Sequence, residues 1–177
     1  MTLHGDLYQH IEPNRRRMVN AIWRIVRDPD DTEDVLQQVL TRVIRREAKV
    51  RRHPNPSALI MRMCVNAALD QLRRSRKKTV VHNSNVDLDS IASRRGDPAE
   101  AVAAEETRRR ILGAFSGLPK REAEAMSLRV LAEQSYTETA AAMGCREATI
   151  RVLVGRARKR LRAQFQGMGI PVPEERQ

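Results

Sequence analysis

Residues 135–162 have the sequence SYTETAAAMGCREATIRVLVGRARKRLR, in which a short helical segment, a glycine and a longer basic segment follow one another. Ser135 and Glu138 have the spacing of a capping box, which predicts that a helix begins there. Ala140 is small enough to let a following helix approach closely, and Gly144 can adopt the positive φ that a tight turn needs. The pattern predicts a helix-turn-helix, with a helical hairpin in a bundle as the alternative.

The second helix of this unit, predicted from about Glu147 to Phe165, carries the candidate DNA contacts. In a helix-turn-helix the N-terminal side chains of this helix contact base edges in the major groove, whereas cations further along contact phosphates or simply solvate the helix. The candidate base contacts are Glu147, Ala148, Thr149, Arg151 and Val152, preceded by Arg146, and the candidate phosphate contacts are Arg156, Arg158, Lys159, Arg160 and Arg162.

The composition indicates a helical protein with a polyanionic partner. The 177-residue chain carries 33 Lys and Arg against 22 Asp and Glu, a formal net charge of +11, which favours binding to nucleic acid or to an anionic membrane surface. Only 3% of the residues are aromatic, so the core has to be built from aliphatic side chains. No region alternates apolar and polar residues long enough to indicate a strand, and we expect an all-α fold.

Charge divides the chain into parts. The net charge is +8 over residues 1–78, −2 over 79–102, +6 over 103–165 and −1 over 166–177. The acidic part contains Asn, Ser, Asp, Gly and Pro without an amphipathic period, which is typical of a flexible linker. We therefore expect two small helical domains, 1–78 and 103–165, joined by a linker over 79–102 and followed by a tail.

Three amphipathic helices are predicted in the N-terminal domain. The first contains Met18, Ile22 and Ile25 at helical spacing and is expected to end at Asp28-Pro29. Candidate N-caps of the second are Asp30, Asp31 and Thr32, and its wide apolar face comprises Val35, Leu36, Val39, Leu40, Val43 and Ile44.

The third helix is predicted to begin at Asn55, as N-cap, and Pro56, at the first helical position. It ends in the run RRSRKK over 73–78, and five cations among six residues exceed what compensation of the helix dipole requires. Its predicted buried stripe comprises Leu59, Ile60, Met63, Cys64, Ala67, Ala68 and Leu72.

The sequence gives no indication of an enzyme, a metal site or a bound cofactor. Nothing resembles a phosphate-binding Walker loop or a nucleophile with its base, and the two cysteines and four histidines lack metal-ligand spacing. No apolar stretch approaches the ~20 residues that span a bilayer, and the N-terminus has no signal-peptide pattern, so we expect a cytoplasmic protein. The cysteines are interpreted as core or turn residues: Cys64 and Cys145.

Several motifs together resemble the extracytoplasmic-function (ECF) sigma factors of the sigma-70 family, over about residues 8–165. The motifs are DDTEDVLQQVL over 30–40, RMCVNAALDQLRR over 62–74, LPKRE over 118–122, SYTETA over 135–140, ATIR over 148–151 and GRARKRLR over 155–162. The resemblance implies a factor that binds core RNA polymerase and directs promoter-specific transcription initiation. It also implies an anti-sigma protein as a regulatory partner.

The resemblance assigns roles to the N-terminal domain. The acidic, Gln-bearing helix is expected to bind polymerase, the next helix to melt and hold the promoter's minus-ten element, and the loop between them to select a flipped base. The residues so assigned are Asp31, Glu33, Asp34, Gln37 and Gln38 for polymerase; Arg62, Asn66, Asp70, Arg73 and Arg74 for the melted strand; and Arg51, Arg52 and His53 for the flipped base. The C-terminal helix-turn-helix is expected to bind the double-stranded minus-thirty-five element.

The chain departs from the family pattern at a few positions. Ala58 stands where the family usually has Trp, Met63-Cys64 where it has Ile-Ala, and Thr139 where it has a core Ile. Val152-Leu153 replaces a usual Ser-Arg, which removes one expected DNA contact. A two-domain helix-turn-helix regulator that does not bind polymerase is the alternative, although it leaves the acidic Gln-bearing helix unexplained.

Overall fold

The computed structural model describes the backbone of residues 5–81 and 98–170, and the side chains of 7–75 and 106–170. All regular secondary structure in these residues is helical, which confirms the all-α prediction. An N-terminal block comprises α1 (Gly5–Ile11), the 3₁₀ turn η1 (Glu12–Asn14), α2 (Arg15–Val26), α3 (Pro29–Arg45), α4 (Glu47–Arg51) and α5 (Pro56–Val81). A C-terminal block comprises α6 (Pro98–Ser116), α7 (Lys120–Val130), α8 (Tyr136–Met143) and α9 (Glu147–Gly167).

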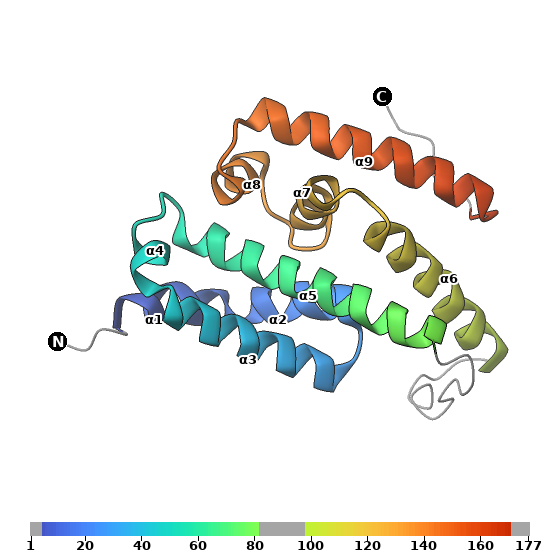
Figure 1. Ribbon diagram of the computed structural model, residues 1–177, viewed down its shortest axis with the longest axis horizontal. Helices are drawn as coiled ribbons and strands as arrows, with labels where there is room; N and C mark the ends of the chain where they lie inside the picture. Colours follow the sequence, from blue (N-terminus) through green and yellow to red (C-terminus); the bar gives the residue numbers. More distant parts are fainter. Residues whose placement is uncertain (1–4, 82–97, 171–177) are drawn as a thin grey trace.

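Helix α5 lies between the two blocks (Figure 1). It packs against α2 and α3 on one side and against α6, α7 and α8 on the other, while α9 covers the outer side of α7. This position explains why α5 is buried around most of its circumference. The predicted stripe residues Ile60, Cys64 and Ala68 are fully buried, but so are Val65 and Leu69 on another face.

The boundary between α2 and α3 corrects one prediction. Asp28 is the N-cap of α3, because its carboxylate accepts a hydrogen bond of 2.8 Å from the backbone N–H of Asp31. The prediction of Asp30, Asp31 or Thr32 as the cap was therefore wrong. Helix α2 ends at Val26, just before Asp28-Pro29 as predicted, and Pro29 occupies the first turn of α3, where its missing N–H leaves no hydrogen bond unmade.

The helix-turn-helix forms as predicted. Ser135 accepts a hydrogen bond from the backbone N–H of Glu138, whose carboxylate accepts one from the backbone N–H of Ser135, which completes the capping box. Gly144 ends α8 with φ 63°, in the left-handed region that glycine tolerates best. One stripe of α9 is buried against α7 and α8: Ile150, Val154, Ala157 and Leu161.

Two helices extend beyond the predicted domain limits. Helix α5 continues to Val81 and α6 begins at Pro98, so helices extend into both ends of the predicted linker over 79–102. The middle of that linker, 82–97, lies outside the described residues, and α9 ends at Gly167. No helix in the described part of the chain is sufficiently long and apolar to cross a bilayer.

Candidate nucleic-acid interface

The N-terminal half of α9 presents the predicted base contacts to solvent. Arg146, Thr149 and Arg151 are exposed, and the Val152 side chain is 52% exposed although it is apolar. Glu147 is half-buried because it accepts a hydrogen bond from Thr137 Oγ1 and lies 3.6 Å from Arg151 Nη2. The face opposite the buried stripe is thus free to enter a DNA groove.

An aromatic residue on α8 holds Arg151. The guanidinium carbons of Arg129 and Arg151 each lie 4.3 Å from the centroid of the Tyr136 ring, so the ring has a cation against it from α7 and another from α9. Such contacts stabilise the position of a cation by about 0.5–1 kcal/mol at exposed sites. The sequence did not identify Tyr136 as a site residue, because pattern reasoning gives no contacts between helices.

The later turns of α9 present a basic surface. Arg156, Arg158 and Lys159 are exposed, as expected of phosphate contacts. Arg160 differs, because its Nε lies 3.0 Å from the buried carboxylate of Glu122 in α7. Leu153, at a position where the family resemblance implied Arg, is half-buried against the core, so it contributes to packing.

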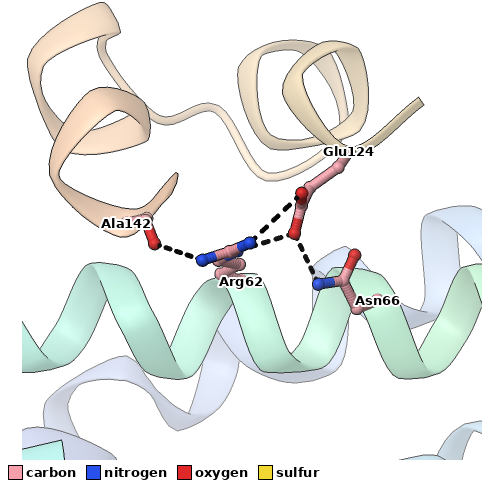
Figure 2. Close-up of polar contacts among 4 residues, drawn as sticks. All are labelled: Arg62, Asn66, Glu124 and Ala142. Atoms are coloured by element: carbon pink, nitrogen blue, oxygen red, sulfur yellow. Dashed lines mark hydrogen bonds and ion pairs between the residues drawn. The ribbon is translucent and has the colours of Figure 1, made fainter. Parts of the chain in front are cut away.

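Three of the predicted strand-binding residues of α5 contact the C-terminal block. Arg62 donates through Nε to Glu124 Oε1 at 2.6 Å and through Nη1 to the carbonyl oxygen of Ala142 at 2.9 Å. Asn66 donates to the same Glu124 oxygen at 2.5 Å (Figure 2). We call Arg62, Asn66, Glu124 and the Ala142 carbonyl the Glu124 cluster. Arg73 Nε lies 3.4 Å from the carbonyl oxygen of Ser116.

The remaining predicted residues near α5 are more accessible. Asp70 and Arg74 are exposed, and Asp70 Oδ1 lies 3.5 Å from Arg73 Nη1. Arg51 and Arg52 are exposed, but the expected loop is partly helical since Arg51 is the last residue of α4. His53 is half-buried in the turn before α5, where its Nδ1 lies 2.8 Å from the carbonyl oxygen of Asn55.

The predicted polymerase contacts lie on the outer face of α3. Glu33, Asp34, Gln37 and Gln38 are exposed along its first three turns, and Gln37 donates a 3.2 Å hydrogen bond to Glu33. Asp31 is set apart from them: it is half-buried and accepts a 2.6 Å hydrogen bond from Gln71 of α5. The structure therefore assembles four of the five residues into one accessible polar surface.

Two titratable groups have shifted pKa values. The pKa of Glu138 is lowered chiefly by the hydrogen bond from the Ser135 backbone; the Ser135 side chain, Arg17 and Arg129 act in the same direction, and partial burial opposes them. Burial raises the pKa of the Cys64 thiol to about 12. Cys64 is thus an inert core residue, as the sequence indicated.

The described residues include no group of three or more His, Cys, Asp or Glu side chains that could hold a metal ion.

Comparison with known protein families gives two matches in order. The model of sigma-70 region 2 matches residues 10–78, and the model of sigma-70 region 4 matches residues 108–161. These ranges fall within the N-terminal and C-terminal blocks respectively.

Similar curated proteins and solved structures agree with this match. The chain is 28% identical over 160 residues to the ECF RNA polymerase sigma factor SigM of Mycobacterium tuberculosis, covering 89% of this chain and 77% of that protein. It is 24% identical over 144 residues to the RNA polymerase sigma factor HrpL of Pseudomonas syringae pv. syringae, covering 81% and 78%.

Two solved structures share the fold at 19% identity. One is RpoE of Bartonella quintana in complex with the anti-sigma factor NepR, with a TM-score of 0.52 over 91% of this chain and 97% of that one. The other is CnrH in complex with the cytosolic domain of CnrY, with a TM-score of 0.55 over 90% and 86%. Since the two region models together match most of the sequence in the order of the two helical blocks, the chain belongs to the sigma-70 family of RNA polymerase sigma factors, within its ECF group.

Proposed function

We propose that this sigma factor divides promoter recognition among three surfaces: the outer face of α3 for core RNA polymerase, α5 with the turn before it for the melted minus-ten strand, and α9 for the double-stranded minus-thirty-five element. The observation that carries the proposal is the exposed N-terminal half of α9. Its polar side chains project from a helix whose opposite stripe is buried, as a major-groove reader requires.

The two ends of α9 have different roles in this proposal. Arg151, held against Tyr136, contacts a base edge, and exposed Val152 adds an apolar contact of the kind that a thymine methyl accepts. Arg156, Arg158 and Lys159 bind phosphates, which contributes affinity without sequence preference.

The α3 surface suits a protein partner. Glu33, Asp34, Gln37 and Gln38 form an exposed polar patch on a helix whose inner face is anchored in the core by Val35 and Val39. An acidic patch on a chain with a net charge of +11 is a poor DNA contact and a good complement to a basic protein surface.

The α5 surface is proposed to hold displaced single-stranded DNA. Asn66 and Asp70 offer hydrogen-bonding groups to unpaired bases, and Arg62, Arg73 and Arg74 offer cations to the phosphates of the same strand. We also propose that the N-terminal domain ends near residue 78 and that the C-terminal domain begins at about residue 103.

The proposal also includes a regulatory partner and a cellular location. One of the structural relatives above, RpoE, was solved with an anti-sigma factor, and we propose a partner of that kind for this chain. Sigma factors are initiation factors and not enzymes in general; we propose that this one acts without catalysis of its own, in the cytoplasm where polymerase and promoters are found.

A binding experiment with core RNA polymerase tests the α3 surface. Immobilised core should retain the full-length chain, and the triple variant Asp34→Asn, Gln37→Ala, Gln38→Ala should bind much more weakly. The matched control, Glu106→Gln with Gln166→Ala, removes one charge and one exposed Gln elsewhere and should bind as the wild type does. If the wild-type chain is not retained at all, the regulator that works without polymerase becomes the better account.

A further inference from the structure

A glycine stands in the middle of the exposed face of α9, the helix on the outer side of α7 (Figure 1). Gly155 lies one turn after Arg151 and one turn before Arg158 and Lys159, and residues three or four positions apart share a face of a helix. All four residues are exposed to solvent. Gly155 therefore separates the part of the face to which the proposed function assigns base contacts from the part to which it assigns phosphate contacts.

The needs of the folded chain do not explain this glycine. Within a helix, glycine is less favourable than every residue except proline. Apart from its chain neighbours and the backbone of its own helix, a Cβ at position 155 would have no heavy atom within 4 Å, so no packing contact excludes a side chain there. Gly155 also lacks the positive φ that Gly144 has at the end of α8. The glycine thus weakens α9 without a compensating contact in the described part of the chain.

The surface around Gly155 is an open hollow with a basic rim. Its volume is about 680 Å³, and none of the described residues that line it is acidic. Because a glycine has no side chain, the helix backbone itself is accessible at this point, and the surrounding cations suit an anionic group. The lining consists of Gly155, Arg158, Lys159, Arg162, Ala163 and Gln166.

The length of α9 places Gly155 where a helix leaves the major groove. The 21 residues of α9 extend over about 31 Å at 1.5 Å per residue, whereas the major groove is only about 12 Å wide. Gly155 is eight residues after Glu147, the first residue of α9, and thus about 12 Å along the helix axis. When the N-terminal residues contact base edges, the helix therefore crosses a phosphate strand near Gly155.

We propose that Gly155 is a contact site for the DNA backbone: the absent side chain lets α9 approach one phosphate strand of the upstream element closely, and Arg158 and Lys159 bind the phosphate that lies in the hollow. The proposal rests on the proposed role of α9 and adds the residue that sets how deeply this helix enters the groove. A side chain at position 155 would hold the helix away from the strand and weaken the phosphate contacts beside it.

Substitutions at position 155 distinguish this role from an effect on stability. In the full-length chain, Gly155→Ala should raise the Tm by about 2–4 °C, because alanine favours a helix. The same variant should nevertheless bind a fluorescein-labelled duplex with a mapped upstream element more weakly in an anisotropy titration, and Gly155→Leu should bind it more weakly still. The matched controls, Gly167→Ala and Gly167→Leu, lie at the exposed far end of α9, where a Cβ also meets no atom, and should bind as the wild type does.

The salt dependence of binding is the second readout. Since log K falls by about 0.9 per phosphate contact for each tenfold rise in salt, loss of one contact should reduce this slope by about 0.9 and raise the Kd about eightfold at 0.1 M salt. Gly155→Leu should show both changes. Arg158→Gln should reduce the slope in the wild-type chain but should have little further effect in the Gly155→Leu background, because the phosphate is already out of reach.

The outcomes separate the glycine from the helix that carries it. A more stable Gly155→Ala chain that binds DNA more weakly, with a smaller salt slope for Gly155→Leu, supports the proposal. Unchanged or tighter binding by both variants overturns it, as do a weaker affinity with an unchanged slope and equal losses in the Gly167 controls. If the wild-type chain binds the mapped element no more tightly than a scrambled duplex, the proposed role of α9 fails, and the proposal for Gly155 fails with it.

Discussion

Replacing Tyr136 with leucine tests whether the Tyr136 ring positions Arg151 of α9 for DNA binding. The change removes the ring between Arg129 and Arg151 while keeping an apolar side chain of similar size. Each cation–π contact contributes about 0.5–1 kcal/mol at an exposed site, and an arginine that loses its fixed position must be ordered again on binding. We therefore expect Tyr136→Leu to weaken binding of the upstream duplex by about 1 kcal/mol, roughly fivefold in Kd.

The conservative variant and a double-mutant cycle make this prediction specific. Tyr136→Phe keeps the ring and should bind the duplex as the wild type does. In an Arg151→Ala background, Tyr136→Leu should have little further effect, because the residue that it positions is already absent. Fluorescence anisotropy on a duplex carrying a mapped promoter gives the four affinities. An equal loss with and without Arg151 would show that Tyr136 acts only on folding, and the positioning argument would fail.

Three further predictions follow from single residues. Arg151→Ala should cost about 1–3 kcal/mol for the cognate upstream element, and a loss of the same size on every duplex would reveal a phosphate contact. The folded pKa of Glu138 is lowered chiefly by the hydrogen bond from the Ser135 backbone, so the ionised carboxylate stabilises the fold above the ordinary pKa of 4.5, and this stabilisation is lost as the pH falls through the folded pKa. Urea unfolding between pH 6 and 3 should show this loss of stability, and Glu138→Gln should lack it. The folded pKa of Cys64 is raised from 9.0 to about 12, so its contribution to stability is complete below 9.0 and is lost as the pH rises through about 12; at pH 8 a thiol reagent should modify Cys145 in the native chain but Cys64 only after unfolding.

Local signals predicted most of the helices. The capping box at Ser135 and the glycine at 144 set the limits of α8, and Asn55 with Pro56 sets the start of α5, because caps and turns depend on a few neighbouring residues. The short helix α4 was missed, since five residues are too few to show a helical period. The true cap of α3, Asp28, was missed because Asp28-Pro29 was interpreted only as the end of the preceding helix, although Pro29 also occupies the first turn of the next one.

Contacts between distant segments could not be predicted in this way. A helical period shows which face of a helix is apolar, but α5 and α7 are buried on several faces because each lies between two partners. Glu124 in the sequence KREAEAMSL has the pattern of a solvated acid on a helix, and only the packing of α7 on α5 makes it the partner of Arg62. The contacts of Tyr136 with Arg129 and Arg151 were not predicted, for the same reason.

The most direct test of the central claim is run-off transcription with purified core RNA polymerase on a genomic promoter library, with and without this chain. New start sites should appear only when the chain is present, and they should share one upstream pair of sequence motifs, one for α5 and one for α9. If the chain neither binds core polymerase nor creates any start site, it does not act as a sigma factor and the assignment of its three surfaces is wrong.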